Sequence, residues 1–118
     1  MKVKGSLPEL VRKSVERDVG RYCENRIPPH ARDQIKMEYK IRGNSVTLIE
    51  RRPPWRPELP PEWSSMPVAQ IRFEDGNWVL YWSDRNSRWH RYWDLDPTPN
   101  LSAVLAEVDE DPTAIFWG

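Results

Sequence analysis

Side chains that could bind a ligand gather between residues 66 and 93, where aromatic and basic residues alternate. Aromatic rings interleaved with arginines on a sheet surface can stack nucleobases and hold phosphates. The pattern therefore predicts a binding face for single-stranded nucleic acid or for a protein. A solvated sheet face with ordinary cross-strand pairs would give the same pattern. The candidate residues are Arg72, Tyr81, Arg88, His90, Tyr92 and Gln70, with Lys40 added from an earlier hairpin.

Catalytic chemistry has little support in the sequence. Glu38 and Lys40 form an E-x-K strand pair of the kind found in metal-dependent nucleases, and His90 could assist them. Such an enzyme needs a second metal-binding acid. Asp33 lies on the same strand and Asp18 on a helix, so neither is well placed. Because E-x-K recurs by chance in charged strands, a metal-dependent hydrolase is the weakest of three functional hypotheses.

No metal, cofactor or nucleophile site is predicted. The two histidines, His30 and His90, and the single cysteine, Cys23, are too few and too scattered for a zinc site. Cys23 falls on the apolar stripe of a predicted helix, which indicates a buried, inert thiol. The chain contains no P-loop, G-x-S-x-G or G-x-G-x-x-G motif.

Three antiparallel strands are expected to position the binding face. Asp75-Gly76 is a two-residue hairpin signal, and the turn from Asp84 to Ser87 would pair Trp82 with Trp89. Side chains alternate between faces along a strand. The face predicted to be core carries Ala69, Ile71, Phe73, Trp78, Leu80, Trp82, Trp89 and Trp93. The face predicted to be exposed carries Gln70, Arg72, Val79, Tyr81, Arg88, His90 and Tyr92.

The rest of the chain supplies the covering layer. Apolar residues recur at helical spacing over residues 7–26, with Ser6 as the expected N-cap. A second helix is expected over residues 99–110, capped by Thr98 or Asn100. These patterns predict one α+β domain, 1–118, in which both helices pack on one face of a five-stranded antiparallel β-meander. The expected strands are 31–42, 45–52, 67–74, 77–83 and 88–93, within a sheet region of 31–93.

A proline-rich segment and an apolar tail suggest a second function. Residues 53–66 hold five of the twelve prolines, which excludes a helix or a central strand. Trp55 and Trp63 are expected to anchor this loop to the body. The tail, 113–118, is apolar enough to dock as a short strand or plug. Together the loop and the tail could instead serve as a regulatory protein-interaction module.

Composition narrows the class of protein but not the partner. The chain has 18 basic and 18 acidic residues. Residues 1–56 hold 14 basic and 7 acidic residues, a net of +7, and residues 57–118 hold 4 and 11, a net of −7. One cysteine, no apolar run of membrane-spanning length and no signal-peptide pattern lead us to expect a cytoplasmic protein without a membrane partner. The oligomeric state is left open.

Several stretches resemble a bacterial family of small proteins known as domain of unknown function 3024. The stretches are HARDQIKMEYKIRGNSVTLIERRPPW (30–55), PVAQIRF (67–73), WVLYWSDRNSRWHRYWDL (78–95) and DPTAIFWG (111–118). The resemblance covers most of the chain after the first helix and implies a single-domain, cytoplasmic, bacterial protein. It implies no activity, substrate or site residue.

Overall fold

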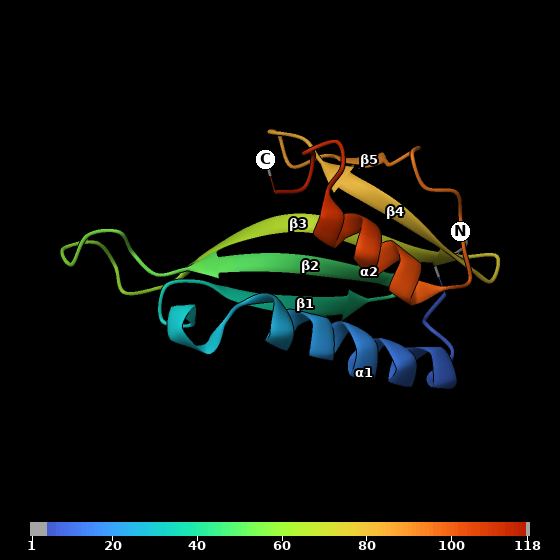
Figure 1. Cartoon of the computed structure of the whole chain (residues 1–118), viewed down its shortest axis with the longest axis horizontal. Coiled ribbons are helices and arrows are strands. Elements are labelled where there is room, and N and C mark those ends of the chain that lie inside the picture. The colour runs from blue at the N-terminus through green and yellow to red at the C-terminus, as the bar shows by residue number, and fades with distance from the viewer. Residues whose placement is uncertain (1–4, 118) are drawn as a thin grey trace.

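The computed structural model describes residues 5–117 and contains one sheet whose five antiparallel strands lie side by side in chain order (Figure 1). The strands are β1 (Lys36–Arg42), β2 (Ser45–Arg52), β3 (Ser64–Glu74), β4 (Asn77–Ser83) and β5 (Trp89–Arg91). Helix α1 (Glu9–Arg26) precedes them and α2 (Leu101–Glu110) follows. The predicted α+β meander is confirmed. Residues 1–4 and 118 lie outside the described residues, so the predicted domain limits are not tested there.

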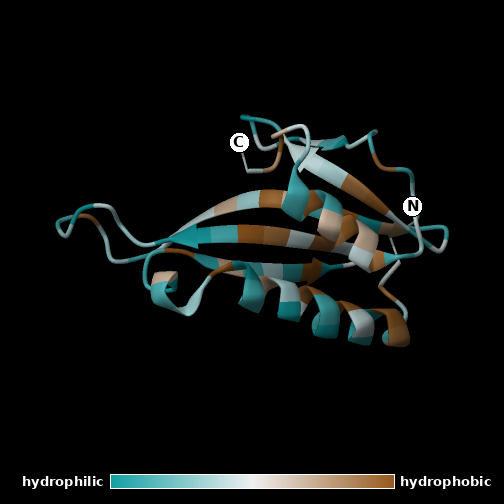
Figure 2. Ribbon diagram, in the orientation of Figure 1, coloured by the Kyte–Doolittle hydropathy of each residue, from teal (hydrophilic) through white to brown (hydrophobic). Residues whose placement is uncertain are grey.

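Both helices lie on one face of the sheet and close the core. In Figure 1, α2 lies in front of β2 and β3, and α1 runs along β1. Figure 2 shows hydrophobic bands along the middle of β2 and β3, where the strands lie behind α2. The largest fully buried side chains come from both layers: Val15, Val19, Val46, Leu48, Ile71, Leu80, Val104 and Val108. Apolar burial between these layers is the main stabilising term of the fold.

Two hairpins have the geometry that their turn residues predict. Asp75 and Gly76 both have positive φ, 53° and 78°, as a primed two-residue turn requires. Phe73 then pairs with Trp78 and Ile71 with Leu80. The turn at Gly43-Asn44 likewise places Ile41 opposite Val46. The hairpin predicted at Asp75-Gly76 is therefore confirmed, and β1 and β2 form a second hairpin of the same kind.

The pairing of β4 with β5 differs from the prediction by one residue. Ser87 has a φ of 62°, and the Asp84 N–H donates to the Arg88 carbonyl over 2.9 Å. The loop therefore has five residues, 84–88, and Trp82 lies opposite His90 instead of Trp89. A shift of one residue moves every side chain of a strand to the other face. The predicted core position of Trp89 and Trp93 is therefore wrong, as is the predicted place of His90 and Tyr92 on the outer side of the sheet. Tyr92 is buried, whereas His90 lies on the helix side and is exposed.

Some helices and strands begin at other residues than predicted, because local hydrogen bonds favour a different backbone conformation there. Helix α1 begins at Glu9 with Pro8 as its N-cap and no side-chain cap bond, so Ser6 is not the cap. Strand β1 begins five residues later than predicted, because residues 29–31 form a 3-10 turn and the N–H of Ile35 donates to the Ala31 carbonyl. Asn100 caps α2, as expected, by accepting from the Ser102 N–H over 3.1 Å.

Strand β3 begins at Ser64, three residues earlier than predicted, and tolerates Pro67 through a β-bulge. The register shifts between Leu48 and Ile49, so Val68 has no partner on β2. A bulge is one of the few places in a sheet where a proline fits. The proline-rich loop is consequently shorter than expected and spans residues 53–63.

The tail docks as a plug. Asp111 ends α2 in the left-handed conformation, and its carboxylate accepts the backbone N–H groups of Phe116 and Trp117 over 3.0 and 2.8 Å. The indole N–H of Trp117 donates to the Val108 carbonyl over 2.8 Å. The Phe116 ring lies against the Tyr92 ring, with 5.1 Å between their centroids. The tail therefore helps to close the core at the end of α2.

The loop is anchored through one of its two tryptophans. The Lys36 ammonium lies 4.6 Å from the centre of the Trp63 ring, which ties the loop's end to β1. Trp55 is 75% exposed, so its predicted role as an anchor is wrong.

We expect Ser87→Gly to stabilise the protein by about 0.5 kcal/mol in urea unfolding. Glycine removes a left-handed strain of about 1–2 kcal/mol, and its extra flexibility offsets about 0.5–1 kcal/mol of that gain. The matched control is Asn86→Gly, because Asn86 is in the same loop but does not have positive φ. This control should destabilise by about 0.5–1 kcal/mol. Equal destabilisation by both variants would contradict the five-residue loop.

Candidate functional site

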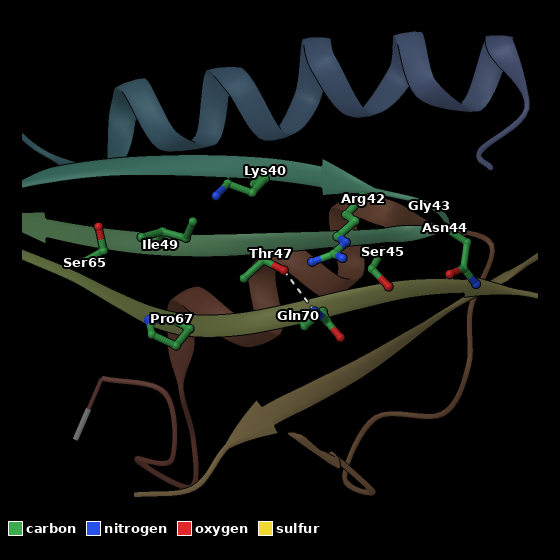
Figure 3. A pocket seen from close by; sticks show the side chains of 10 residues that line it. All are labelled: Lys40, Arg42, Gly43, Asn44, Ser45, Thr47, Ile49, Ser65, Pro67 and Gln70. Carbon is green, nitrogen blue, oxygen red and sulfur yellow. Dashed lines mark hydrogen bonds between the residues drawn. The ribbon is translucent and has the colours of Figure 1, made fainter. Parts of the chain in front are cut away.

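The face of the sheet opposite the helices, here called the outer face, is open and hollowed. In Figure 3 α2 lies behind the sheet, α1 runs alongside β1, and the outer face of β1, β2 and β3 points toward the viewer. A hollow of about 600 Å³ lies over these three strands. Ten residues line it: Lys40, Arg42, Gly43, Asn44, Ser45, Thr47, Ile49, Ser65, Pro67 and Gln70. A space of this size falls within the range of small-ligand sites.

One row of directly opposed residues crosses all five strands on this face. Lys40 pairs with Thr47, Thr47 with Gln70, Gln70 with Tyr81, and Tyr81 with Arg91. Residues directly opposite one another share a face of the sheet. This outer row carries a cation at each end, and hydroxyl and amide groups between them. It is the structural unit that connects most of the predicted site residues.

Hydrogen bonds and stacking hold the middle of the outer row in place. The Gln70 side-chain amide donates to the Thr47 hydroxyl over 3.0 Å, and its oxygen accepts from the Arg72 Nε over 2.7 Å. The Arg72 guanidinium covers the Tyr81 ring, 3.8 Å from its centre. The Tyr81 hydroxyl donates to Glu74 over 3.0 Å, and burial and this bond raise the Tyr81 pKa. The Tyr81 phenol therefore stays protonated and donates a hydrogen bond at neutral pH. Because Arg72 covers the Tyr81 ring, the planar group offered to a ligand at this position is the guanidinium.

The outer face carries an excess of positive charge. Its strands point six basic side chains outward, Lys36, Lys40, Arg42, Arg51, Arg72 and Arg91, against two acidic ones, Glu38 and Glu74. Both acids are engaged, because Glu38 pairs with Arg51 at 3.5 Å and Glu74 accepts from Tyr81. Within residues 5–117, no ion pair involves Lys40, Arg42, Arg72 or Arg91. These four cations are the ones available to an anionic ligand.

Arg91 and Trp93 are functional candidates that the sequence analysis missed. The Arg91 guanidinium lies 4.0 Å from the centre of the Trp93 ring, and Trp93 is 72% exposed. The shifted register of β5 places Arg91 on the outer face beside Tyr81. The sequence carries no signal for them, because Ser87, which adds a residue to the loop, has no intrinsic preference for the left-handed conformation that it adopts.

The predicted site residues divide into three groups. Lys40, Gln70, Arg72 and Tyr81 come together on the outer face, as predicted. Arg88 lies exposed in the loop 84–88. His90 and Tyr92 lie on the helix side, so neither belongs to the outer face.

His90 and Tyr92 have structural partners on the helix side. The His90 ring stacks on Trp82 with 4.6 Å between centroids, and its Nε2 lies 2.7 Å from Asp84. That hydrogen bond and the Arg88 backbone N–H lower the pKa of Asp84 to about 2. Tyr92 is only 3% exposed and donates to Glu107 over 2.7 Å. Burial, followed by this bond, raises the pKa of Tyr92 to about 12.

The residues of the hydrolase hypothesis do not form a site. Glu38 and Lys40 share the outer face, but Glu38 is engaged with Arg51 and His90 lies on the helix side of the sheet. Residues 5–117 bring together no group of three His, Cys, Asp or Glu side chains that could hold a metal ion. Cys23 is buried, as predicted, and burial raises the pKa of its thiol to about 12. Such a thiol is a poor nucleophile.

The fold and this face define a small α+β protein with an open, basic sheet surface. Residues 7–118 match the family model described as "Domain of unknown function (DUF3024)". The chain belongs to this family, as the resemblance indicated. No curated protein and no solved structure matches it. No helix in residues 5–117 is long and apolar enough to cross a membrane.

We expect Tyr92→Ala to destabilise the protein by about 3–5 kcal/mol, because it removes a buried aromatic ring. Arg88→Ala should change the stability by less than about 0.5 kcal/mol, since the side chain is exposed and the residue's loop bonds come from its backbone. Urea unfolding of both variants measures the difference. A Tyr92→Ala protein as stable as Arg88→Ala would contradict the placement of Tyr92 in the core.

Proposed function

We propose that this protein is a non-catalytic module that binds single-stranded nucleic acid on the outer face. The observation that carries the proposal is the outer row itself, with Lys40 and Arg91 at its ends and Gln70 and Tyr81 between. Cations with no ion-pair partner attract phosphates, and amide, hydroxyl and guanidinium groups can contact bases and sugars. The hydrogen bonds that hold Gln70 and Arg72 reduce the ordering that a ligand would require.

The shape of the face favours a single strand over a duplex. The grooves of a duplex admit a protruding helix or ribbon, whereas the outer face is a hollow in a sheet. A flexible strand can follow such a surface and present its bases to it. The excess of outward basic side chains favours a nucleic acid over an ordinary protein partner.

We expect the double variant Lys40→Ala with Arg42→Ala to weaken binding of a labelled 12-nucleotide single strand in fluorescence anisotropy. Both side chains line the hollow, and Figure 3 shows the Arg42 side chain extending over β2 toward Thr47. If each cation neutralises one phosphate, the slope of log affinity against log salt should become shallower by about 1.4.

The matched control is Arg12→Ala with Lys13→Ala. These residues lie on α1 and are paired with Glu16 and Glu9 at 3.3 and 3.6 Å. The control changes net charge by the same amount but leaves the outer face intact. A wild-type protein without salt-sensitive binding, or equal loss in both double variants, would refute the proposal.

A second candidate function is protein interaction through the proline-rich loop. The loop projects beyond the ends of β2 and β3 (Figure 1) and turns at Pro57-Glu58, where the Leu59 N–H donates to the Arg56 carbonyl over 3.2 Å. Trp55 is exposed, with the Arg56 guanidinium stacked 4.0 Å from its ring centre. Proline-rich segments are preorganised ligands for aromatic grooves. Because the tail is docked on the body, the loop is the better candidate for the contact surface.

Replacing residues 53–63 by a Gly-Ser segment of equal length tests this candidate. We expect the variant to keep its thermal unfolding temperature within a few degrees, because the loop adds little to the core, and to lose partners that the wild type retains in affinity purification. The variant with Lys40→Ala and Arg42→Ala should retain those partners. Retention of the same partners by the loop variant would exclude the loop as their contact.

A further inference from the structure

Trp93 is an aromatic platform at one end of the outer row. One side of its ring is covered by the Arg91 guanidinium, and 72% of the residue is exposed to solvent. A lone exposed tryptophan has little meaning by itself. Trp93 differs because its cation partner is the terminal member of a row that continues through Tyr81 and Gln70 to Lys40. Nucleobases stack on exposed aromatic rings with little sequence preference.

The length of the outer row sets the size of a ligand that can use both ends. Neighbouring strands are about 4.8 Å apart, so four intervals from Lys40 to Arg91 span about 19 Å. A stacked strand advances about 3.4 Å per nucleotide, so this span corresponds to about six nucleotides, and to fewer if the strand is extended. A mononucleotide cannot contact both ends.

We infer that the bound strand crosses the β-strands from the Lys40 and Arg42 end to the Trp93 end. Its phosphates contact the cations of β1, and one of its bases stacks on Trp93. This inference rests on the proposed nucleic-acid function and adds to it a path, a site size and a stacking residue. Trp93 acts in binding only, and no covalent step is involved.

The experiment compares single strands of 2, 4, 6, 8 and 12 nucleotides with wild type and variants in fluorescence anisotropy. For wild type the affinity should rise steeply up to about six nucleotides and slowly beyond that length. Trp93→Ala should weaken binding of the longer strands by about 5- to 100-fold, the effect of losing one stacked base. It should leave dinucleotide binding nearly unchanged. Trp93→Phe should retain most of the affinity but lose part of the tryptophan quenching that binding causes.

The control is Trp55→Ala. Trp55 is as exposed as Trp93, at 75%, and carries an arginine at the same 4.0 Å, but it lies on the proline-rich loop. The inference is overturned if Trp93→Ala binds like wild type or if Trp55→Ala loses as much affinity. In either case, the proposed function would still hold if wild type binds single strands in a salt-sensitive manner that depends on Lys40 and Arg42. If no strand binds wild type, both fail.

Discussion

The pairing of β4 with β5 decides which side chains this protein presents on its outer face. Side chains alternate with a period of two, so one additional loop residue exchanges the two faces of the strand that follows. Ser87 supplies that residue by adopting a left-handed conformation. As a result Arg91 extends the outer row, while His90 stacks on Trp82 on the helix side. The Arg91 end of the outer row, and the place of Trp93 beside it, depend on this register.

Tryptophan serves mainly as a partner of cations in this protein. Within the described residues, 5–117, four of the seven tryptophans contact a basic side chain: Trp55, Trp63, Trp93 and Trp117. A cation over an exposed ring gains only about 0.5–1 kcal/mol. The contact matters more for order than for stability, because a guanidinium stacked on a ring keeps one orientation. On the outer face, Arg72 over Tyr81 and Arg91 over Trp93 are ordered in this way, and no carboxylate of residues 5–117 forms an ion pair with either arginine.

The C-terminal segment closes the helix side and leaves the outer face free. Trp78 and Thr98 exchange two backbone hydrogen bonds, of 2.7 and 3.1 Å, which attach the segment before α2 to β4. Tyr92, Phe116 and Trp117 then fill the region around the end of α2. Because both helices and the tail pack on the same side, the opposite side of β1, β2 and β3 keeps its hollow. The topology therefore gives the sheet one face that forms the core and one face, the outer face, that is open to a ligand.

The sequence by itself determined the features that local chemistry controls. The turn at Asp75-Gly76, the alternation along β1 to β4 and the apolar stripes of both helices specify five strands, two helices and four of the site residues: Lys40, Gln70, Arg72 and Tyr81. Only the tertiary structure decided the register of β5, the bulge at Val68 and the hydrogen bonds that hold the docked tail. The physical reason is that Ser87 has no intrinsic preference for positive φ, and that a proline in a strand indicates an edge or a strand start as readily as a bulge. The longer loop allows Tyr92 to pack against α2, and this contact stabilises the observed register. The residue pattern of the strand alone does not predict that contact.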